Sequence, residues 1–188
     1  MPAGRGPALV IRGATPQNAG RDDRTRTRTG PARAEVQVFH DEGGSTETAH
    51  ILALLAAADR RRHVREVINP ALERNAVVLC DRYVYATFGV FVHRGVDFRF
   101  LATINEGIPR PDHAFYLKLP TDELLRRLRE RDGDRLKHEE RSAERVESIT
   151  RTYEELGSEL VHIDGTTPRE GVTAEILRPE PAASPDVA

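Results

Sequence analysis

The sequence of 188 residues is 38% hydrophobic and 31% charged, which is typical of one globular domain with a substantial core. A formal net charge of −2 argues against broad binding to nucleic acid, and no apolar run reaches the roughly 20 residues needed to span a membrane. The single cysteine, Cys80, excludes an intrachain disulfide, and no signal-peptide pattern opens the chain, so we expect a cytoplasmic protein without a membrane segment.

The beginning of the chain predicts two short strands. Residues 8–11 form an apolar run, and residues 35–39 alternate between apolar and polar side chains. Between them, residues 14–34 are polar and irregular, and they lack the apolar stripe with which a helix covers a sheet. We therefore expect residues 14–34 to be atypical within the domain.

The middle of the chain predicts a long helix followed by a central strand. Residues 46–67 have helical periodicity, and Pro70 is expected to interrupt or kink the helix because proline lacks a backbone donor. Residues 76–80 predict the central strand, and residues 85–104 predict a largely helical segment. The expected core positions of the long helix are Ile51, Leu52, Leu54, Leu55 and Val64.

The rest of the chain continues the alternation of strands and helices. Residues 113–119 predict a strand, and Thr121 is expected to cap a helix over residues 122–131. The segments expected next are a break at Gly133, a helix over residues 139–156, a strand over 160–164 and a disordered tail over 178–188. Residues 1–177 thus predict one α/β domain, a three-layer α/β/α sandwich with a parallel sheet.

The triplet Asp81-Arg82-Tyr83 follows the predicted central strand directly. Ligands of open α/β sheets bind beyond the carboxyl ends of the strands, and a guanidinium offers a planar fork of donors that suits a phosphate. Arg82 is therefore a candidate for gripping a phosphate, and Asp81 could orient Arg82 or hold Mg²⁺ through water. The alternative is an aspartate that caps a helix beside a surface arginine.

Two segments of the sequence resemble the thymidylate kinase family. Residues 57–63, which read Ala-Ala-Asp-Arg-Arg-Arg-His, are similar to the family's A-x-D-R-x-x-H segment, and the triplet is similar to its D-R-Y motif. The resemblance spans roughly residues 35–165. It implies a P-loop kinase fold, transfer of the ATP γ-phosphoryl group to dTMP to give dTDP, a requirement for Mg²⁺, and a homodimer.

The resemblance also implies the roles of individual residues in the nucleotide site. Arg82 matches the family's ligand of the acceptor phosphate, and Arg60 matches the arginine that reads the pyrimidine carbonyl. Tyr83 and Thr87 are expected beside them in the substrate site. The alternative for Arg60 is an exposed helical arginine beside its arginine neighbours.

Two departures from the family concern the choice of substrate. Ala56 stands where the family usually has an aromatic residue that stacks on the base, unless Phe88 or Phe91 takes over that role. Val90 stands near the position of the tyrosine that crowds a ribose 2′-hydroxyl. Both departures leave open a kinase for another pyrimidine monophosphate.

Residues 42–44, which read Glu42-Gly43-Gly44, resemble the family's R-E-P-G-G-T turn, which shapes the acceptor site; an ordinary turn is the alternative. Residues 132–139 resemble the lid over the phosphates. There Arg131, Arg135 or Lys137 could offset the charge on the transferred group. The alternative is a charged connection between two helices.

The sequence lacks a competent ATP-binding loop of the form G-x-x-x-x-G-K-[ST]. In the closest window, residues 15–22, Gly20 is retained, Arg21 replaces the lysine and Asp22 replaces the hydroxyl residue. If this window binds ATP, Gly20 and Arg21 are the expected contacts. Three explanations stay open: a local frameshift, divergence into an inactive nucleotide-binding or partner-binding relative, or an unusual loop that works differently.

Overall fold

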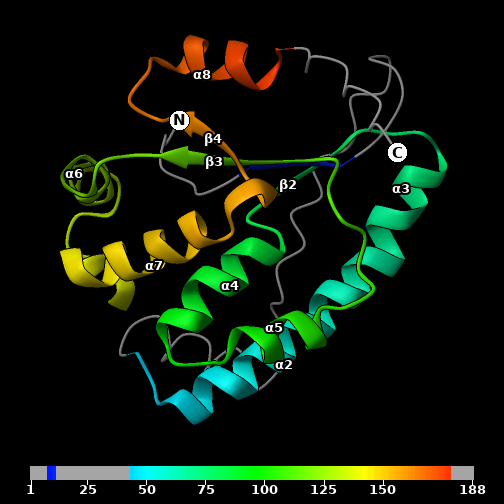
Figure 1. Ribbon diagram of the computed structural model, residues 1–188, viewed down its shortest axis with the longest axis horizontal. Coiled ribbons are helices and arrows are strands. Elements are labelled where there is room, and N and C mark those ends of the chain that lie inside the picture. The colour runs from blue at the N-terminus through cyan, green and yellow to red at the C-terminus, as the bar shows by residue number, and fades with distance from the viewer. Residues whose placement is uncertain (1–7, 12–42, 179–188) are drawn as a thin grey trace, which may run out of the picture.

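The computed structural model describes residues 8–11 and 43–178, which form a mixed α/β structure (Figure 1). The strands are β1 (Ala8–Ile11), β2 (Val78–Asp81), β3 (His113–Lys118) and β4 (Val161–Asp164). The α-helices are α2 (Thr46–His63), α3 (Asn69–Glu73), α4 (Val84–His93), α5 (Phe98–Ile104), α6 (Thr121–Asp132), α7 (Ala143–Glu155) and α8 (Arg169–Ile176). A π-helix η1 (Val64–Ile68) joins α2 to α3, and the 3₁₀ helices η2 (His138–Arg141) and η3 (Gly157–Glu159) flank α7.

The described strands form one sheet in the order β2-β1-β3-β4, and only part of it is parallel. Strand β3 is parallel to β4, whereas β1 is antiparallel to both β2 and β3. The prediction of a parallel sheet is therefore wrong for β1, because a short apolar run carries no signal for its direction. Since β2 and β3 both oppose β1, β2, β3 and β4 run the same way, and their carboxyl ends share one edge.

Helices cover both faces of this sheet. Figure 1 shows α8 above the sheet and α4 and α7 below it, with α2 and α3 beyond α4. The main core lies among β3, α2, α4, α5 and α7, where Ile68 and Leu101 are fully buried. A smaller core of Leu125, Leu128 and Val146 joins α6 to α7.

Helix α2 begins where the sequence predicts, and Ser45 caps it by accepting a hydrogen bond from the Thr48 amide (3.1 Å). Its inner face is lined by alanines that lie one turn apart, namely Ala49, Ala53 and Ala57. Leu52 and Val64 are buried as expected. The other three expected core positions are wrong, because Ile51, Leu54 and Leu55 are 41–49% exposed.

The predicted interruption near Pro70 is confirmed as a local widening of the helix. The amide of Asn69 donates to the carbonyl of Val64, five residues earlier, within the π-helical segment. Pro70 then lies in the first turn of α3, which continues directly from η1.

Several helix boundaries differ from the predictions. Helix α6 starts at Thr121 with Pro120 as its cap, so the expected cap by Thr121 is wrong. Gly133 ends α6 with φ 57°, as predicted. Residues 85–104, predicted to be largely helical, form the two helices α4 and α5, which are separated at Gly95 with φ 83°.

Some predictions fall outside the described residues. The strand expected at residues 35–39, the irregular stretch 14–34 and the tail from residue 179 onward are among these. Within residues 8–11 and 43–178, no helix is both long enough and apolar enough to cross a membrane.

Candidate functional site

The turn between β2 and α4 holds Arg82 in an unusual backbone conformation. Strand β2 ends at Asp81, Arg82 has φ 63°, and Tyr83 then leads into α4. Arg82 and Asn75 are the two non-glycine residues with positive φ in the described part of the chain. This left-handed conformation costs roughly 1–2 kcal/mol for a residue with a Cβ, and such strain is concentrated at functional sites.

The side chains of Asp81 and Arg82 are exposed at the end of β2. Arg82 also lies close to the hydroxyl of Tyr153 on α7: burial raises the pKa of Tyr153, and the charge and hydrogen bond of Arg82 partly offset that rise. Arg82 is therefore anchored beside the core while its guanidinium is accessible to a dissolved anion.

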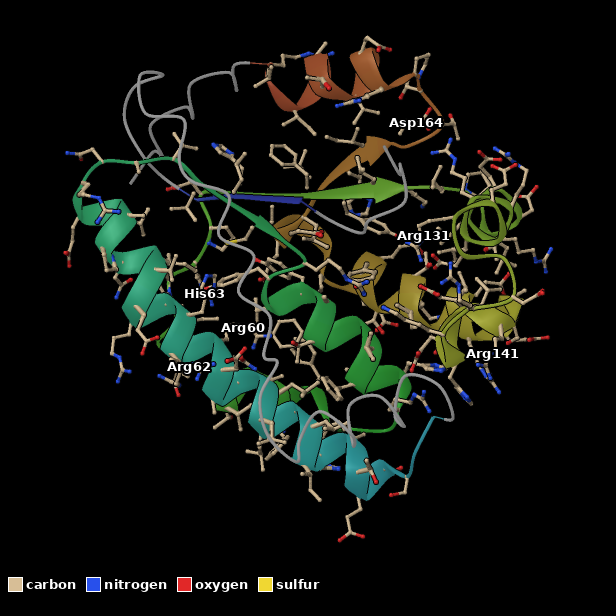
Figure 2. All side chains as sticks on the ribbon, turned by 180° about the vertical axis from the view of Figure 1, so that it is seen from behind. Arg60, Arg62, His63, Arg131, Arg141 and Asp164 are labelled. Atoms are coloured by element: carbon tan, nitrogen blue, oxygen red, sulfur yellow. The ribbon has the colours of Figure 1, made fainter. Side chains whose placement is uncertain are left out.

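Arg60 on α2 turns inward and is held by side chains from two other segments (Figure 2). Its Nη2 donates to the hydroxyl of Thr87 on α4 (2.5 Å), and its Nη1 donates to Oδ1 of Asn105 after α5. Its guanidinium carbon lies 6.0 Å from the ring centroid of Tyr83. The alternative of an exposed helical arginine is therefore wrong, and Arg60, Tyr83 and Thr87 are brought together.

Burial sets the electrostatics of this cluster. Desolvation lowers the pKa of Arg60, and the nearby Tyr83 and Asp59 counteract that effect in part. Desolvation likewise raises the pKa of Tyr83 to about 12, and the Tyr83 hydroxyl donates to the carbonyl of Pro109 (3.2 Å). Arg60 thus presents a charged donor in a partly dry environment, where a hydrogen bond to a ligand is strengthened.

Sequence reasoning assigned no role to Asn105, which completes this cluster. Asn105 is 5% exposed, and its Nδ2 donates to the carbonyl of Leu101 (2.8 Å). The one available signal was a polar residue directly after the predicted helical segment, four positions after the apolar Leu101 and so on the face that Leu101 would share if the helix continued. Its partner Arg60 lies 45 residues away in the chain, so no local pattern links the two.

The two aromatic residues considered as substitutes for a stacking ring are both in the core. Phe88 is 7% exposed and packs against Tyr85 and Phe98, with ring centroids 6.2 and 5.0 Å apart, and Phe91 is 9% exposed. Ala56, one turn before Arg60, supplies no ring. The ring that adjoins Arg60 is that of Tyr83.

The glycine turn before α2 contacts the segment after α6. Glu42 lies outside the described residues, while Gly43 and Gly44 have φ 100° and 57°. A Cβ on Gly43 would lie 2.6 Å from Nη1 of Arg94 and 2.7 Å from Cε1 of His138. The Gly43 carbonyl accepts a hydrogen bond from Arg94, so this turn is fixed by close packing.

Arg94 continues this contact into the segment predicted as a lid. Its Nε donates to Oε1 of Glu139 (2.9 Å), and the two side chains are only 10% and 8% exposed. Sequence reasoning missed this buried ion pair, which joins the end of α4 to η2 across 45 positions.

The two lid arginines expected to meet phosphates differ in their surroundings. Arg131 donates to Asp132 (2.5 Å) and to Glu140 (3.4 Å), and these carboxylates raise its pKa. Arg135 is exposed and forms no ion pair within the described part of the chain. Arg135 therefore has more capacity than Arg131 to neutralise a ligand's charge.

The expected ATP contacts Gly20 and Arg21 lie outside the described residues. Within residues 8–11 and 43–178, no group of three or more His, Cys, Asp or Glu side chains could hold a metal ion. Among these described residues, Asp81 therefore belongs to no preformed cluster of metal ligands.

Two arginines lie next to Tyr83 and offer two kinds of contact to a ligand. Arg60 provides donors in a partly buried setting, which suits a neutral acceptor such as a carbonyl. Arg82, the residue before Tyr83, provides an exposed cation, which suits an anion. The pair fits a ligand with a carbonyl edge at one end and a phosphate at the other.

The chain is similar to known proteins over most of its described residues. The family model described as thymidylate kinase matches residues 32–176. A probable thymidylate kinase of Pyrococcus abyssi is 47% identical over 88 residues, which cover 47% of this chain and 43% of that protein. The thymidylate kinase of Desulfotalea psychrophila is 30% identical over 142 residues, which cover 75% of this chain and 69% of that protein.

The length of the matches differs among relatives. The chain spans less than half the length of the Pyrococcus relatives, whereas the thymidylate kinase of Halothermothrix orenii is 35% identical over 137 residues, 63% of its own length. The family match covers more than half of this chain and includes every described site residue. The chain therefore belongs to the thymidylate kinase family.

Proposed function

We propose that this chain transfers the γ-phosphoryl group of ATP to dTMP, giving dTDP. The observation that carries the proposal is the guanidinium of Arg60, which is partly buried beside Tyr83 and donates to Thr87, in a chain of the thymidylate kinase family. In this proposal Arg60 donates to a carbonyl of thymine, and Thr87 and Tyr83 line the base site. Arg82 holds the monophosphate.

Phosphoryl transfer depends mainly on positioning and on stabilising charge. Gly43 and Gly44 would shape the acceptor side of the site, and Arg135 would cover the charge that builds on the transferred group. Mg²⁺ is usually held by one or two carboxylates together with water and substrate phosphates. The exposed Asp81 fits that role through water, and the phosphates would supply the remaining oxygens.

A second candidate is a relative that binds a nucleotide or a partner protein without transferring phosphate. The family match begins at residue 32, so the window 15–22 lies outside it, and that window lacks the lysine of an ATP loop. Retention of ATP binding through Gly20, Arg21 or Arg131 is the feature that separates the first candidate from the second.

Assembly and overall architecture complete the proposal. Three large aliphatic side chains of α2, namely Ile51, Leu54 and Leu55, are 41–49% exposed, and a second copy of the chain would cover them. We propose a homodimer for this reason, with each complete chain forming a three-layer α/β/α sandwich. A kinase that consumes ATP is expected in the cytoplasm.

The test combines a transfer assay with calorimetric titration. Radiolabelled γ-phosphate from Mg-ATP should appear in dTDP when dTMP is present, and both nucleotides should bind. Binding of dTMP without transfer or ATP binding would support the second candidate instead. Failure to bind dTMP, together with transfer to no pyrimidine monophosphate, would contradict the proposal.

A further inference from the structure

We propose that Asn105 is a positioning residue that aims the guanidinium of Arg60 at the base and thereby sets base preference. The inference rests on the proposed function, because it requires that Arg60 faces a pyrimidine. Asn105 would not touch the nucleotide; it would act through Arg60.

The hydrogen bonds of Asn105 define its orientation. Its Nδ2 donates to the carbonyl of Leu101 (2.8 Å), one helical turn earlier in the chain. The amide nitrogen is therefore committed to the backbone of α5, and the oxygen Oδ1 is turned toward Nη1 of Arg60. Because Asn105 is only 5% exposed, water does not readily replace either bond.

Two neutral oxygens and one ring hold the guanidinium of Arg60. Oδ1 of Asn105 accepts from Nη1, the hydroxyl of Thr87 accepts from Nη2, and the Tyr83 ring lies beside the guanidinium. No carboxylate forms an ion pair with Arg60 among the residues that the structure describes. The neutral acceptors thus fix the direction of the guanidinium, and the nearby Asp59 stabilises its positive charge only in part.

The guanidinium of Arg60 has further donors beyond these two hydrogen bonds. An arginine has five N–H groups, and these two hydrogen bonds use two of them. Since both terminal nitrogens are anchored, the other N–H groups point in fixed directions. A fixed N–H group can donate to a carbonyl oxygen but not to an amino group. Thymine has a carbonyl at ring position 4, where cytosine has an amino group.

The lack of a stacking ring from Ala56, Phe88 or Phe91 makes the orientation of the Arg60 guanidinium more important for binding a base. Ala56 offers no ring for the base, and Phe88 and Phe91 are buried in the core. A base in this site therefore depends more on hydrogen bonds to Arg60 than a base held by aromatic stacking does. A site built around hydrogen bonds discriminates strongly when their geometry is kept.

The neighbouring Arg61 provides a matched structural control. Its Nη2 donates to the carbonyl of Glu106, so it also ties α2 to the turn after α5, in an exposed position. Arg61→Ala removes a tie between the same two segments without touching the guanidinium of Arg60. Any effect that comes only from loosening these segments should appear in both variants.

The experiment compares wild type, Asn105→Ala and Arg61→Ala by thermal melting and by calorimetric titration with dTMP and with dCMP. We expect wild type to prefer dTMP. Asn105→Ala should weaken dTMP binding about tenfold, the scale of a hydrogen bond to a charged group, and reduce the preference over dCMP by a similar factor. Arg61→Ala should retain both the affinity and the preference.

An unchanged preference in Asn105→Ala, or an equal loss for both nucleotides, would overturn the inference. If Asn105→Ala does not melt cooperatively, Asn105→Ser, which keeps part of the side-chain volume, is judged by the same two criteria. If the wild-type protein binds no pyrimidine monophosphate, the proposed function itself is contradicted. The two failures are therefore distinguished by the wild-type titration.

Discussion

Replacing Arg82 with glycine should separate the stability of the protein from its binding of phosphate. Arg82 has φ 63°, a conformation that costs a residue with a Cβ roughly 1–2 kcal/mol and costs glycine nothing. Glycine also loses roughly 0.5–1 kcal/mol of additional chain entropy on folding. Arg82→Gly also removes the hydrogen bond to the Tyr153 hydroxyl, which contributes roughly 0.5–1.5 kcal/mol, so its free energy of unfolding should stay within about 1.5 kcal/mol of that of wild type.

The free energy of dTMP binding should change by more than the free energy of unfolding does. A hydrogen bond to a charged group contributes roughly 1.5–3 kcal/mol, so Arg82→Gly should bind dTMP about 10- to 150-fold more weakly than wild type. Thymidine lacks the phosphate, and its affinity should not change. Stability is measured by denaturant titration, and both affinities are measured by calorimetry.

Asn75 offers a matched control, because it has φ 55° in the turn before β2 and is not part of the candidate site. Asn75→Gly should leave the binding of dTMP and of thymidine intact. Equal losses for dTMP and thymidine in Arg82→Gly would refute the reasoning, as would an unchanged affinity for dTMP.

Two further predictions concern stability. Gly89→Ala would place a Cβ 2.8 Å from the ring of buried Tyr153 and should destabilise the protein by about 1–3 kcal/mol. Gly171→Ala, whose Cβ meets only ordinary contacts at 3.5 Å, should stabilise helix α8 by up to about 1 kcal/mol. Melting curves that rank the two variants in the reverse order would contradict the packing argument. Burial and neighbouring arginines lower the pKa of His93 and of His138 below the ordinary 6.5. Because the unfolded chain then binds more protons than the folded one, stability should fall as the pH drops below about 6.5. A melting temperature that is unchanged between about pH 7.5 and 5.5 would contradict this prediction.

The segments that the sequence predicted well are those with strong local patterns. The strand before Asp81, the helix that starts at Thr46 and the helix end at Gly133 are all found close to their expected positions. Each has a signal within a few residues: an apolar run, a helical periodicity or a glycine that adopts a positive φ.

The predictions that failed required information about packing. Helix α2 buries small alanines and exposes Ile51, Leu54 and Leu55, because close approach of the helix to its neighbours, and not side-chain size, decides its inner face. The direction of β1 is set by its two neighbours in the sheet, and four apolar residues do not encode it.

The same limit applies to the candidate site. Arg82 and Arg60 could be proposed from short motifs, and the structure adds the strained backbone of the first and the buried partners of the second. Asn105 and the ion pair of Arg94 with Glu139 could not be predicted, because each joins residues 45 positions apart. Such pairs leave no local periodicity in the sequence.

A crystal structure of the complete chain with dTMP tests the central claim most directly. The account predicts that a carbonyl oxygen of thymine lies about 3 Å from a guanidinium nitrogen of Arg60 and that phosphate oxygens lie at a similar distance from Arg82. A dTMP molecule bound elsewhere, or bound with its phosphate away from Arg82, would contradict it.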